Sequence, residues 1–340
     1  MLEVMPRVPY SELYEALLRA MLHLGFEGER AELSARLFAE TTRDGVYTHG
    51  LNRFPRLAAM VANGSVDVKA SAVRVAGAGS LERWDGHRGP GNLNAHAAMT
   101  RTIELAREHG IGGVALGNTN HWMRGGTYGW MAAEAGLFAM CWSNTLANLP
   151  PWGAKTPALG NTPFVIAVPR SAGHVVVDMA MSQFSYGTLA AYAGRGAQLP
   201  VPGGYDTAGN LTQDAAAIEA SQRALPIGYW KGSGLALVLD MVAAMLSGGL
   251  ATHEIPRDST REAGISQMFL AIDPSSVAAR EELDRVADGI VASLAEATPV
   301  DPSRPVRYPG EETVRVREEN MRLGVPVEDA VWRMVRGLTF

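Results

Sequence analysis

Five short apolar runs after residue 70 constrain the fold of this chain more than any other feature. They are rich in β-branched or aromatic residues and bounded by turn residues: IGGVALG (111–117), LFAMCWSN (137–144), PFVIAVP (163–169), HVVVDMAM (174–181) and GISQMFLAIDP (264–274). Segments with helical spacing alternate with them, such as 93–109, which precedes the first run and is closed by a glycine. This alternation predicts an α/β protein with a sheet of several strands.

The first 70 residues have a different pattern. Apolar side chains at Leu13, Leu17 and Met21 repeat at helical spacing, and a second helical pattern runs from about residue 28 to 45. We therefore predict a helical unit over residues 1–70 and an α/β region over 71–272. Residues 273–340 contain a long amphipathic helical pattern and two shorter ones.

Composition limits the class of partner. The chain has 340 residues, 47% of them hydrophobic, and a net charge of -5, which argues against binding to nucleic acid or to an anionic membrane and favours a small-molecule ligand. The first thirty residues lack the apolar run of a secretory signal, and a single cysteine, Cys141, excludes an internal disulfide, so we expect a cytoplasmic protein. The apolar run 234–250 is too short to cross a bilayer, contains Asp240, and predicts a buried helix.

Several familiar frameworks are missing from the sequence. No G-x-G-x-x-G follows a strand, and no G-x-x-x-x-G-K-[ST] occurs, which excludes the Rossmann fingerprint and the P-loop. H-E-x-x-H and G-x-S-x-G are also absent. Candidate chemistry must therefore be sought in other polar clusters.

The stretch DGVYTHGLNRFP (44–55) holds one such cluster. If a helix begins at Thr48, His49 and Arg53 lie at i and i+4 on one face. Histidine titrates near neutral pH, at about 6.5, and the planar guanidinium of arginine suits a carboxylate. Local spacing alone fits either a proton donor beside an anchor for an acid substrate or the solvated end of a surface helix.

Further polar clusters lie at the ends of the predicted strands. NTNHWMRGGTYG (118–129) places His121 and Arg124 before a glycine-rich helix entry, whose amides could receive an anion, or else form a hydrogen-bonded turn. Asp178 lies within an apolar strand, so it must find a partner or shift its pKa, either as a functional carboxylate or as the cap of a neighbouring loop. Lys231, in YWKGSG, suits phosphate or ribose oxygens, although such turns also serve as tight packing points.

Five motifs taken together resemble the malate/L-lactate/sulfolactate dehydrogenase family of non-Rossmann nicotinamide-dependent oxidoreductases: GVYTHGLNRFP, NHWMRGGTYGW, PPWGAK, VDMAMSQFSYG and GYWKGSGLALVLDM. The resemblance extends from about Ser11 to the last helix. It implies a homodimer with a mixed-sheet NAD(P)-binding α/β domain and a helical domain built from both chain ends. Residues 71–272 would bind cofactor and substrate, while 273–340 would pack on residues 1–70 and contribute a cofactor turn.

The resemblance also implies roles for particular residues. His49 is expected to donate the proton, Arg53 to bind the substrate carboxylate, and Thr48 to retain the hydroxyl of the serine that many relatives have. His121 and Arg124 are expected to line the substrate pocket, and Asp178 either to orient or stabilise the histidine or to contact the cofactor. The residues expected to bind the cofactor are His174, Val175, Val176, Val177, Asp178, Met179, Ala180, Trp230, Lys231, Glu311, Glu312 and Thr313.

The same motifs imply a substrate class. The HWMRGG, FSYG and LPIGYWKGSG blocks favour NADH-dependent reduction of a 2-keto sugar acid, 2,3-diketo-L-gulonate to 3-dehydro-L-gulonate. Adjacent carboxylates at Glu311 and Glu312 should repel a 2′-phosphate and favour NAD, but the turn lacks the family's histidine, which leaves NADP open. The inverted GNTP order (160–163) is a further departure.

Other functions remain as alternatives. The substrate would instead be another 2-keto acid, of malate or lactate type, or a cyclic imine acid, since the same histidine and arginine serve each. A metal-dependent lyase or hydrolase would use His49, His121, His174 and Asp178 as ligands, although we expect no metal. A binding or sensor module would keep the fold without activity.

Overall fold

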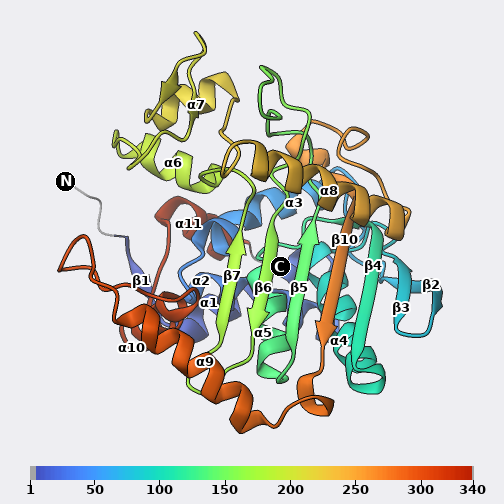
Figure 1. Cartoon of the computed structure of the whole chain (residues 1–340). Coiled ribbons are helices and arrows are strands. Elements are labelled where there is room, and N and C mark those ends of the chain that lie inside the picture. Colours follow the sequence, from blue (N-terminus) through green and yellow to red (C-terminus); the bar gives the residue numbers. More distant parts are fainter. Residues whose placement is uncertain (1–4, 339–340) are drawn as a thin grey trace.

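A computed structural model describes residues 5–338, and its centre is a mixed sheet of seven strands in the order β2-β3-β4-β10-β5-β6-β7 (Figure 1). Only β3 and β4 pair in parallel; the other neighbours are antiparallel. The strands are β2 Val73–Ala78, β3 Leu81–Asp85, β4 Ile111–Asn120, β5 Phe138–Ser143, β6 Phe164–Val168, β7 Val175–Met179 and β10 Ala263–Ile272. The predicted α/β fold is confirmed, and the five apolar runs form β4, β5, β6, β7 and β10.

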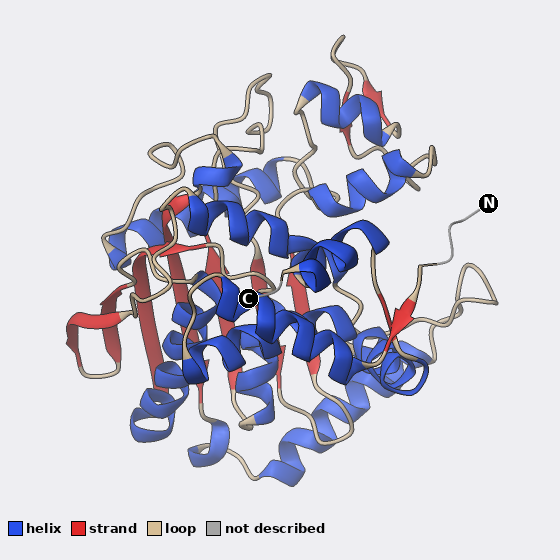
Figure 2. Cartoon of the chain, turned by 180° about the vertical axis from the view of Figure 1, so that it is seen from behind, coloured by secondary structure: helices blue, strands red, loops and turns tan. Residues whose placement is uncertain are grey.

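Helices cover one face of this sheet (Figure 2). α4 (Gly91–His109) packs on β4, and α5 (Gly126–Glu134) packs on β5 and β6. Side chains such as Val114, Cys141 and Phe269 fill the core between these helices and the sheet. As predicted, Gly110 ends α4, with a φ of 82° that glycine adopts without strain.

Helices from both chain ends pack together, as the family resemblance implied. One hydrophobic core joins Leu13 and Met21, near the N-terminus, to Trp332 and Val335, near the C-terminus. A two-stranded sheet of β1 with β11 also pairs the two ends. The elements are β1 Arg7–Val8, α1 Tyr10–His23, α2 Gly28–Arg43, α3 Phe54–Ala62, α10 Glu311–Leu323, β11 Val325–Pro326 and α11 Asp329–Gly337.

The other face of the sheet is only partly covered. Figure 1 shows α8 crossing its upper part and α9 lying below, with the strands visible between them. Met140 and Ile166, on β5 and β6, are exposed there. Besides β10, the elements between β7 and α10 are α6 Tyr186–Gly194, β8 Gly204–Tyr205, β9 Leu211–Thr212, α7 Ala215–Ser221, α8 Trp230–Ser247, η3 Ser259–Arg261, η4 Pro274–Ser276 and α9 Arg280–Ala295.

The prediction that α8 is a buried helix was wrong. Its inner side packs on the sheet through residues such as Leu239 and Ala243, but Met241 and Met245 on its outer side are 50% and 80% exposed. Among the described residues, α8 alone is long and apolar enough to be a candidate membrane span. Its buried Asp240 accepts hydrogen bonds from Asn144 and Thr252, so α8 is fastened into the fold beside the sheet.

Candidate functional site

The stretch 44–55 does not form the predicted helix. Tyr47–His49 (η1) and Leu51–Arg53 (η2) are two 3₁₀ turns, separated by Gly50, and α3 begins at Phe54. A Cβ on Gly50 would lie 2.3 Å from Thr42 Oγ1 of α2, and that oxygen accepts a hydrogen bond from Leu51 N at 2.8 Å. This close contact with α2 interrupts the helix. The prediction that His49 and Arg53 lie one turn apart on the same face of a helix was therefore wrong.

Thr48 also has a different role from the predicted helix cap. Its Oγ1 lies 3.0 Å from His49 Nδ1, and it caps neither 3₁₀ turn. When the threonine hydroxyl donates to Nδ1, the proton of the neutral imidazole is on Nε2, the other ring nitrogen. The hydroxyl that the family resemblance singled out therefore contacts the candidate proton donor directly.

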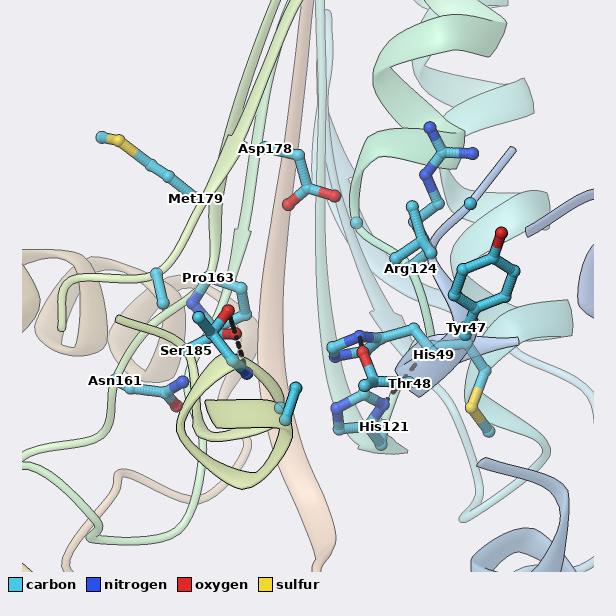
Figure 3. Close-up of a pocket in the computed structure, with 18 of the residues that line it drawn as sticks. Tyr47, Thr48, His49, His121, Arg124, Asn161, Pro163, Asp178, Met179 and Ser185 are labelled. Atoms are coloured by element: carbon cyan, nitrogen blue, oxygen red, sulfur yellow. Dashed lines mark hydrogen bonds between the residues drawn. The ribbon is translucent and has the colours of Figure 1, made fainter. Parts of the chain in front are cut away.

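His49 and Arg53 still lie at the same region of the surface, where two adjacent pockets, here called chambers, share part of their lining. The first, which we call the Asp178 chamber, has a volume of about 450 Å³ and is bordered by Asp178, Met179 and Arg124. The second, the Arg53 chamber, has a volume of about 410 Å³. The residues that line both chambers are Thr48, His49, His121, Thr145, Asn161, Ser185 and Gly187. His49 thus lies at the junction of the two chambers, and Figure 3 shows it beside His121 in the Asp178 chamber.

The two histidines at this junction are stacked. Their ring centroids are 5.7 Å apart and their planes differ by 23°. His121 Nδ1 accepts a hydrogen bond from Met123 N at 3.0 Å, which leaves Nε2 as the protonated nitrogen of the neutral ring. Burial, and then the charges of Arg53, Arg124 and Arg56, lower the pKa of His49 to about 4. The pKa of His121 is also lowered, mainly by burial.

Arg53 is a guanidinium without a protein partner. Within residues 5–338 it forms no ion pair and no side-chain hydrogen bond, although it lines the Arg53 chamber. Burial, followed by repulsion from Arg56, lowers its pKa to about 10, so it remains charged at neutral pH. Glu262 acts on Arg53 through its charge but without a direct contact, and a ligand carboxylate would compensate the guanidinium more fully.

A compensated pair lies in the same chamber. Arg56 Nη2 contacts Glu262 Oε2 at 2.8 Å, and Leu146 N donates to Glu262 Oε1 at 3.2 Å. Glu262 is 3% exposed. The sequence analysis missed this pair because its members are separated by 206 positions and have no local pattern in common.

Arg124 is held on the other side of the cavity by a buried carboxylate. Its Nη1 lies 2.7 Å from Asp44 Oδ2, and Arg317 of α10 contacts both Asp44 oxygens at 2.8 Å. Burial alone would raise the pKa of Asp44, but Arg317, Arg124 and Arg43 outweigh it and lower the pKa to about 2. Arg124 therefore lines the Asp178 chamber rather than the Arg53 chamber.

Asp178 faces the Asp178 chamber from β7 and accepts a hydrogen bond from Gly126 N, at 2.8 Å, through Oδ2. Gly126 is the first residue of α5, so the glycine-rich helix entry does receive an anion, the protein's own carboxylate. Asp178 is exposed toward the chamber, and partial desolvation by the surrounding protein raises its pKa, against the effect of Arg124 and the Gly126 amide. Figure 3 shows Asp178 apart from His49, and no hydrogen bond joins them among the described residues.

Two of the three segments expected to bind the cofactor lie at β7. Its last residues, with Ala180, reach the Asp178 chamber, while His174, just before its start, contacts Trp130 with ring centroids 5.8 Å apart. Val176 N donates to Pro309 O at 3.0 Å, which places the turn before α10 against β7. Glu311, Glu312 and Thr313 form the first turn of α10. The structure thus brings two of the three expected segments together.

The third segment lies elsewhere. Trp230 and Lys231 begin α8, are exposed, and line neither chamber of the same chain. Glu312 forms ion pairs with Arg307 and Arg315, so much of its charge is neutralised. Across residues 5–338, the structure has no cluster of three His, Cys, Asp or Glu side chains suited to a metal ion.

Some residues of the cavity were not predicted, although their motifs were noticed. Asn161, in the inverted GNTP, is linked to Asn148 by two hydrogen bonds of 2.7 and 3.0 Å. Tyr186, in the FSYG block, donates to Asn148 O. Asp44 is the first residue of the stretch that contains His49, but nothing local marks it as the partner of arginines 80 and 273 positions away.

Comparison with known proteins supports an oxidoreductase. Residues 8–336 match the malate/L-lactate dehydrogenase family. Two curated relatives, the 2,3-diketo-L-gulonate reductases of Citrobacter koseri and Klebsiella pneumoniae, are 44% and 45% identical over 98% of this chain and 100% of theirs. The crystal structure of delta1-piperideine-2-carboxylate reductase from Pseudomonas syringae pvar. tomato is similar with a TM-score of 0.88 and 28% identity, covering 98% of this chain and all of that one.

Proposed function

Because the chain belongs to the malate/L-lactate dehydrogenase family, we propose that this oxidoreductase uses NADH to reduce the C2 keto group of 2,3-diketo-L-gulonate to give 3-dehydro-L-gulonate. The observation that supports this most directly is the pair at the cavity junction. Arg53 is a half-buried charge without a direct partner among the described residues, and His49 lines both chambers. A 2-keto acid needs one anchor for its carboxylate and one proton donor for its carbonyl oxygen.

The Asp178 chamber fits the nicotinamide end of the cofactor. Met179 gives it an apolar wall, and Arg124, which Asp44 holds in place, gives it a positively charged one that suits a polar group of a ligand. Bound NADH supplies the hydride. We place the rest of the dinucleotide along His174–Ala180 and the turn at Glu311–Thr313, with Trp230 and Lys231 as further contacts. The preference for NAD over NADP rests mainly on Glu311, since Glu312 is ion-paired.

In the Arg53 chamber, Arg53 binds the C1 carboxylate and so directs the adjacent carbonyl toward the junction. That carboxylate also neutralises the largest charge that lowers the pKa of His49. The pKa therefore rises when substrate binds, and His49 becomes able to donate its Nε2 proton to the developing alkoxide. Asp178 is across the chamber from the histidine, which supports its role as a cofactor contact (Figure 3).

Replacement of His49 tests the proposal. His49→Gln should lower kcat by about 10²–10⁴-fold, the usual contribution of a general acid, while NADH still binds in a fluorescence titration. His109→Gln is a matched control, because His109 is partly exposed at the end of α4, far from the cavity. A His49→Gln enzyme with normal turnover of 2,3-diketo-L-gulonate would refute the assignment.

The principal alternative is a different keto or imine acid. The 28%-identical structure is named a reductase of a cyclic imine acid, and Arg53 and His49 would serve such a substrate equally well. Purified protein should be compared on 2,3-diketo-L-gulonate, pyruvate, oxaloacetate and an imine acid by the decrease in NADH absorbance. If a chelator removed the activity, a metal-dependent lyase or hydrolase would replace the proposed reductase.

We further propose that the chain works as a homodimer in the cytoplasm. Support for a second copy comes from the uncovered face of the sheet, where Val238, Met241 and Met245 of α8 form an exposed apolar stripe. A helix that is apolar on all sides is normally covered, and large exposed apolar patches mark interaction sites. Support for the cytoplasm comes from the single cysteine, and a net charge of -5 argues against nucleic acid.

A further inference from the structure

We propose that the Arg56–Glu262 pair recognises the hydroxylated tail of the substrate and selects polyhydroxy 2-keto acids over short or dicarboxylic ones. The pair lines the Arg53 chamber with the proposed carboxylate anchor, and His49 lines both this chamber and the Asp178 chamber. A substrate anchored at Arg53, with its carbonyl toward His49, would extend its remaining carbons into this chamber. The inference rests on the proposed function and adds the substrate class to it.

The pair has unused hydrogen-bonding groups of both kinds. Arg56 donates within the described chain through Nη2 alone, so Nη1 has no protein acceptor and is not enclosed by the protein. Glu262 accepts one hydrogen bond at each oxygen, from Arg56 and from Leu146 N, and a carboxylate can accept about four. Free donors and free acceptors therefore lie side by side, and a sugar hydroxyl, which donates and accepts at once, complements both.

The charge of the pair argues against a second carboxylate. Arg56 is already neutralised by Glu262 at 2.8 Å, so a dicarboxylic substrate would bring a like charge beside Glu262 without a free cation to receive it. Arg257 at the chamber's mouth is exposed, and its one hydrogen bond, to Pro157 O, is long at 3.4 Å. Water screens a charge in that position. The chamber thus has one half-buried anion site, at Arg53, and one neutral polar site, at the Arg56–Glu262 pair.

Three substrates with a common 2-keto acid head test this directly: pyruvate without a tail, oxaloacetate with a carboxylate tail, and 2,3-diketo-L-gulonate with a hydroxylated tail. Glu262→Gln removes the negative charge that neutralises Arg56, so Arg56 becomes free to bind an anion. The ratio of kcat/KM for the sugar acid to that for oxaloacetate should fall by about 10–100-fold, since unpaired polar groups dominate such discrimination. Arg56→Lys retains the charge but loses the planar fork, and should lower the ratio in the same direction by a smaller factor.

Arg261→Gln is the matched control, because Arg261 is adjacent in sequence but exposed, 3.9 Å from Asp258, and lines neither chamber. The ratio of kcat/KM for the sugar acid to that for oxaloacetate should be the same in Arg261→Gln as in the wild type. Unchanged ratios in both Glu262→Gln and Arg56→Lys, with melting temperatures that show folded protein, would overturn the inference.

A binding measurement separates this inference from the proposed reaction. L-gulonate has the carboxylate and the hydroxyls but no keto group, so it reports recognition without turnover. Its dissociation constant, from a tryptophan fluorescence titration, should rise about tenfold in Glu262→Gln. If the wild type reduced none of the three keto acids yet showed this dependence, the reaction would be wrong and the tail site would stand. Equal L-gulonate affinity in wild type and variant would count against the tail site itself.

Discussion

His49 has an unusual set of neighbours for a proton donor. Arg53, Arg56 and Arg124 act on it, His121 stacks against it, and Thr48 is its only hydrogen-bond partner within the described residues. No carboxylate is among them. The free protein therefore holds His49 neutral at pH 7, and the charge that favours its protonated form must arrive with the substrate.

The pH dependence of the reaction should show this. With a pKa of about 4 in the free enzyme, the protonated fraction of His49 falls about tenfold for each pH unit above that value. The kcat/KM for reduction should therefore rise steadily as the pH falls from 8 to 5. The reverse reaction needs the neutral ring as a base, so its kcat/KM should stay flat over the same range. Initial rates measured in both directions from pH 8 to 5 test this prediction. A flat pH profile for reduction would contradict the assigned role of His49.

Arg53 should govern both affinity and this profile. Arg53→Met removes a charge-assisted contact of about 1.5–3 kcal/mol, so KM should rise by one to two orders of magnitude. The same change removes a charge that lowers the pKa of His49, and the pH profile for reduction should shift upward. The steady-state parameters of the variant across the pH range test both effects. Arg19→Met, on the outer side of α1, is a suitable control; an unchanged KM in Arg53→Met would exclude Arg53 as the anchor.

At the scale of elements, the sequence correctly predicted the strands and helix ends that depend on a local pattern of residues. β-Branched runs and turn residues gave the five strands, and a glycine gave the end of α4. The path of 47–53 depends instead on how Gly50 packs on Thr42 of α2, a contact that periodicity cannot reveal. The error at α8 has the same origin, because an apolar composition indicates burial without showing what covers the helix.

Asp44 joins three elements and shows why part of the site was beyond sequence analysis. It ends α2, and it binds Arg124 from the loop before α5 and Arg317 from α10. Those partners are 80 and 273 positions away. No local motif marks such a connection, although it fixes the position of Arg124 in the Asp178 chamber.

Removing this carboxylate should be strongly destabilising. Asp44→Asn leaves several arginines without compensation, and the unfolding free energy should fall by about 3–5 kcal/mol, the usual cost of breaking a buried pair. The folded pKa of about 2 lies below the unfolded value of 3.8, so the stabilising effect is complete above pH 3.8 and is lost as the pH falls through 2. Urea unfolding at pH 7 measures the loss. Asp329→Asn, in an exposed pair with Arg333, should change stability by less than about 1 kcal/mol.

At the scale of the whole molecule, the mixed sheet and the shared helical core of the two chain ends agree with what the five motifs implied. The uncovered sheet face does not follow from those motifs. α8 has an exposed apolar stripe, and Met140 and Ile166 are exposed on the strands below it. Figure 1 shows α8 lying across the same side of the sheet as the open parts of β5 and β6, and the exposed residues of these elements give the proposed dimer a specific location.

A charge placed in the stripe tests that location. Met241 is 50% exposed near the centre of α8, and Met241→Glu would bury a carboxylate in the interface at a cost of several kcal/mol. Light scattering should give twice the chain mass of 36.3 kDa for the wild type and the single mass for the variant. Val300→Glu introduces the same charge on a fully exposed loop and should remain dimeric. A wild-type monomer would exclude the dimer, and a dimeric Met241→Glu would place the interface on another face.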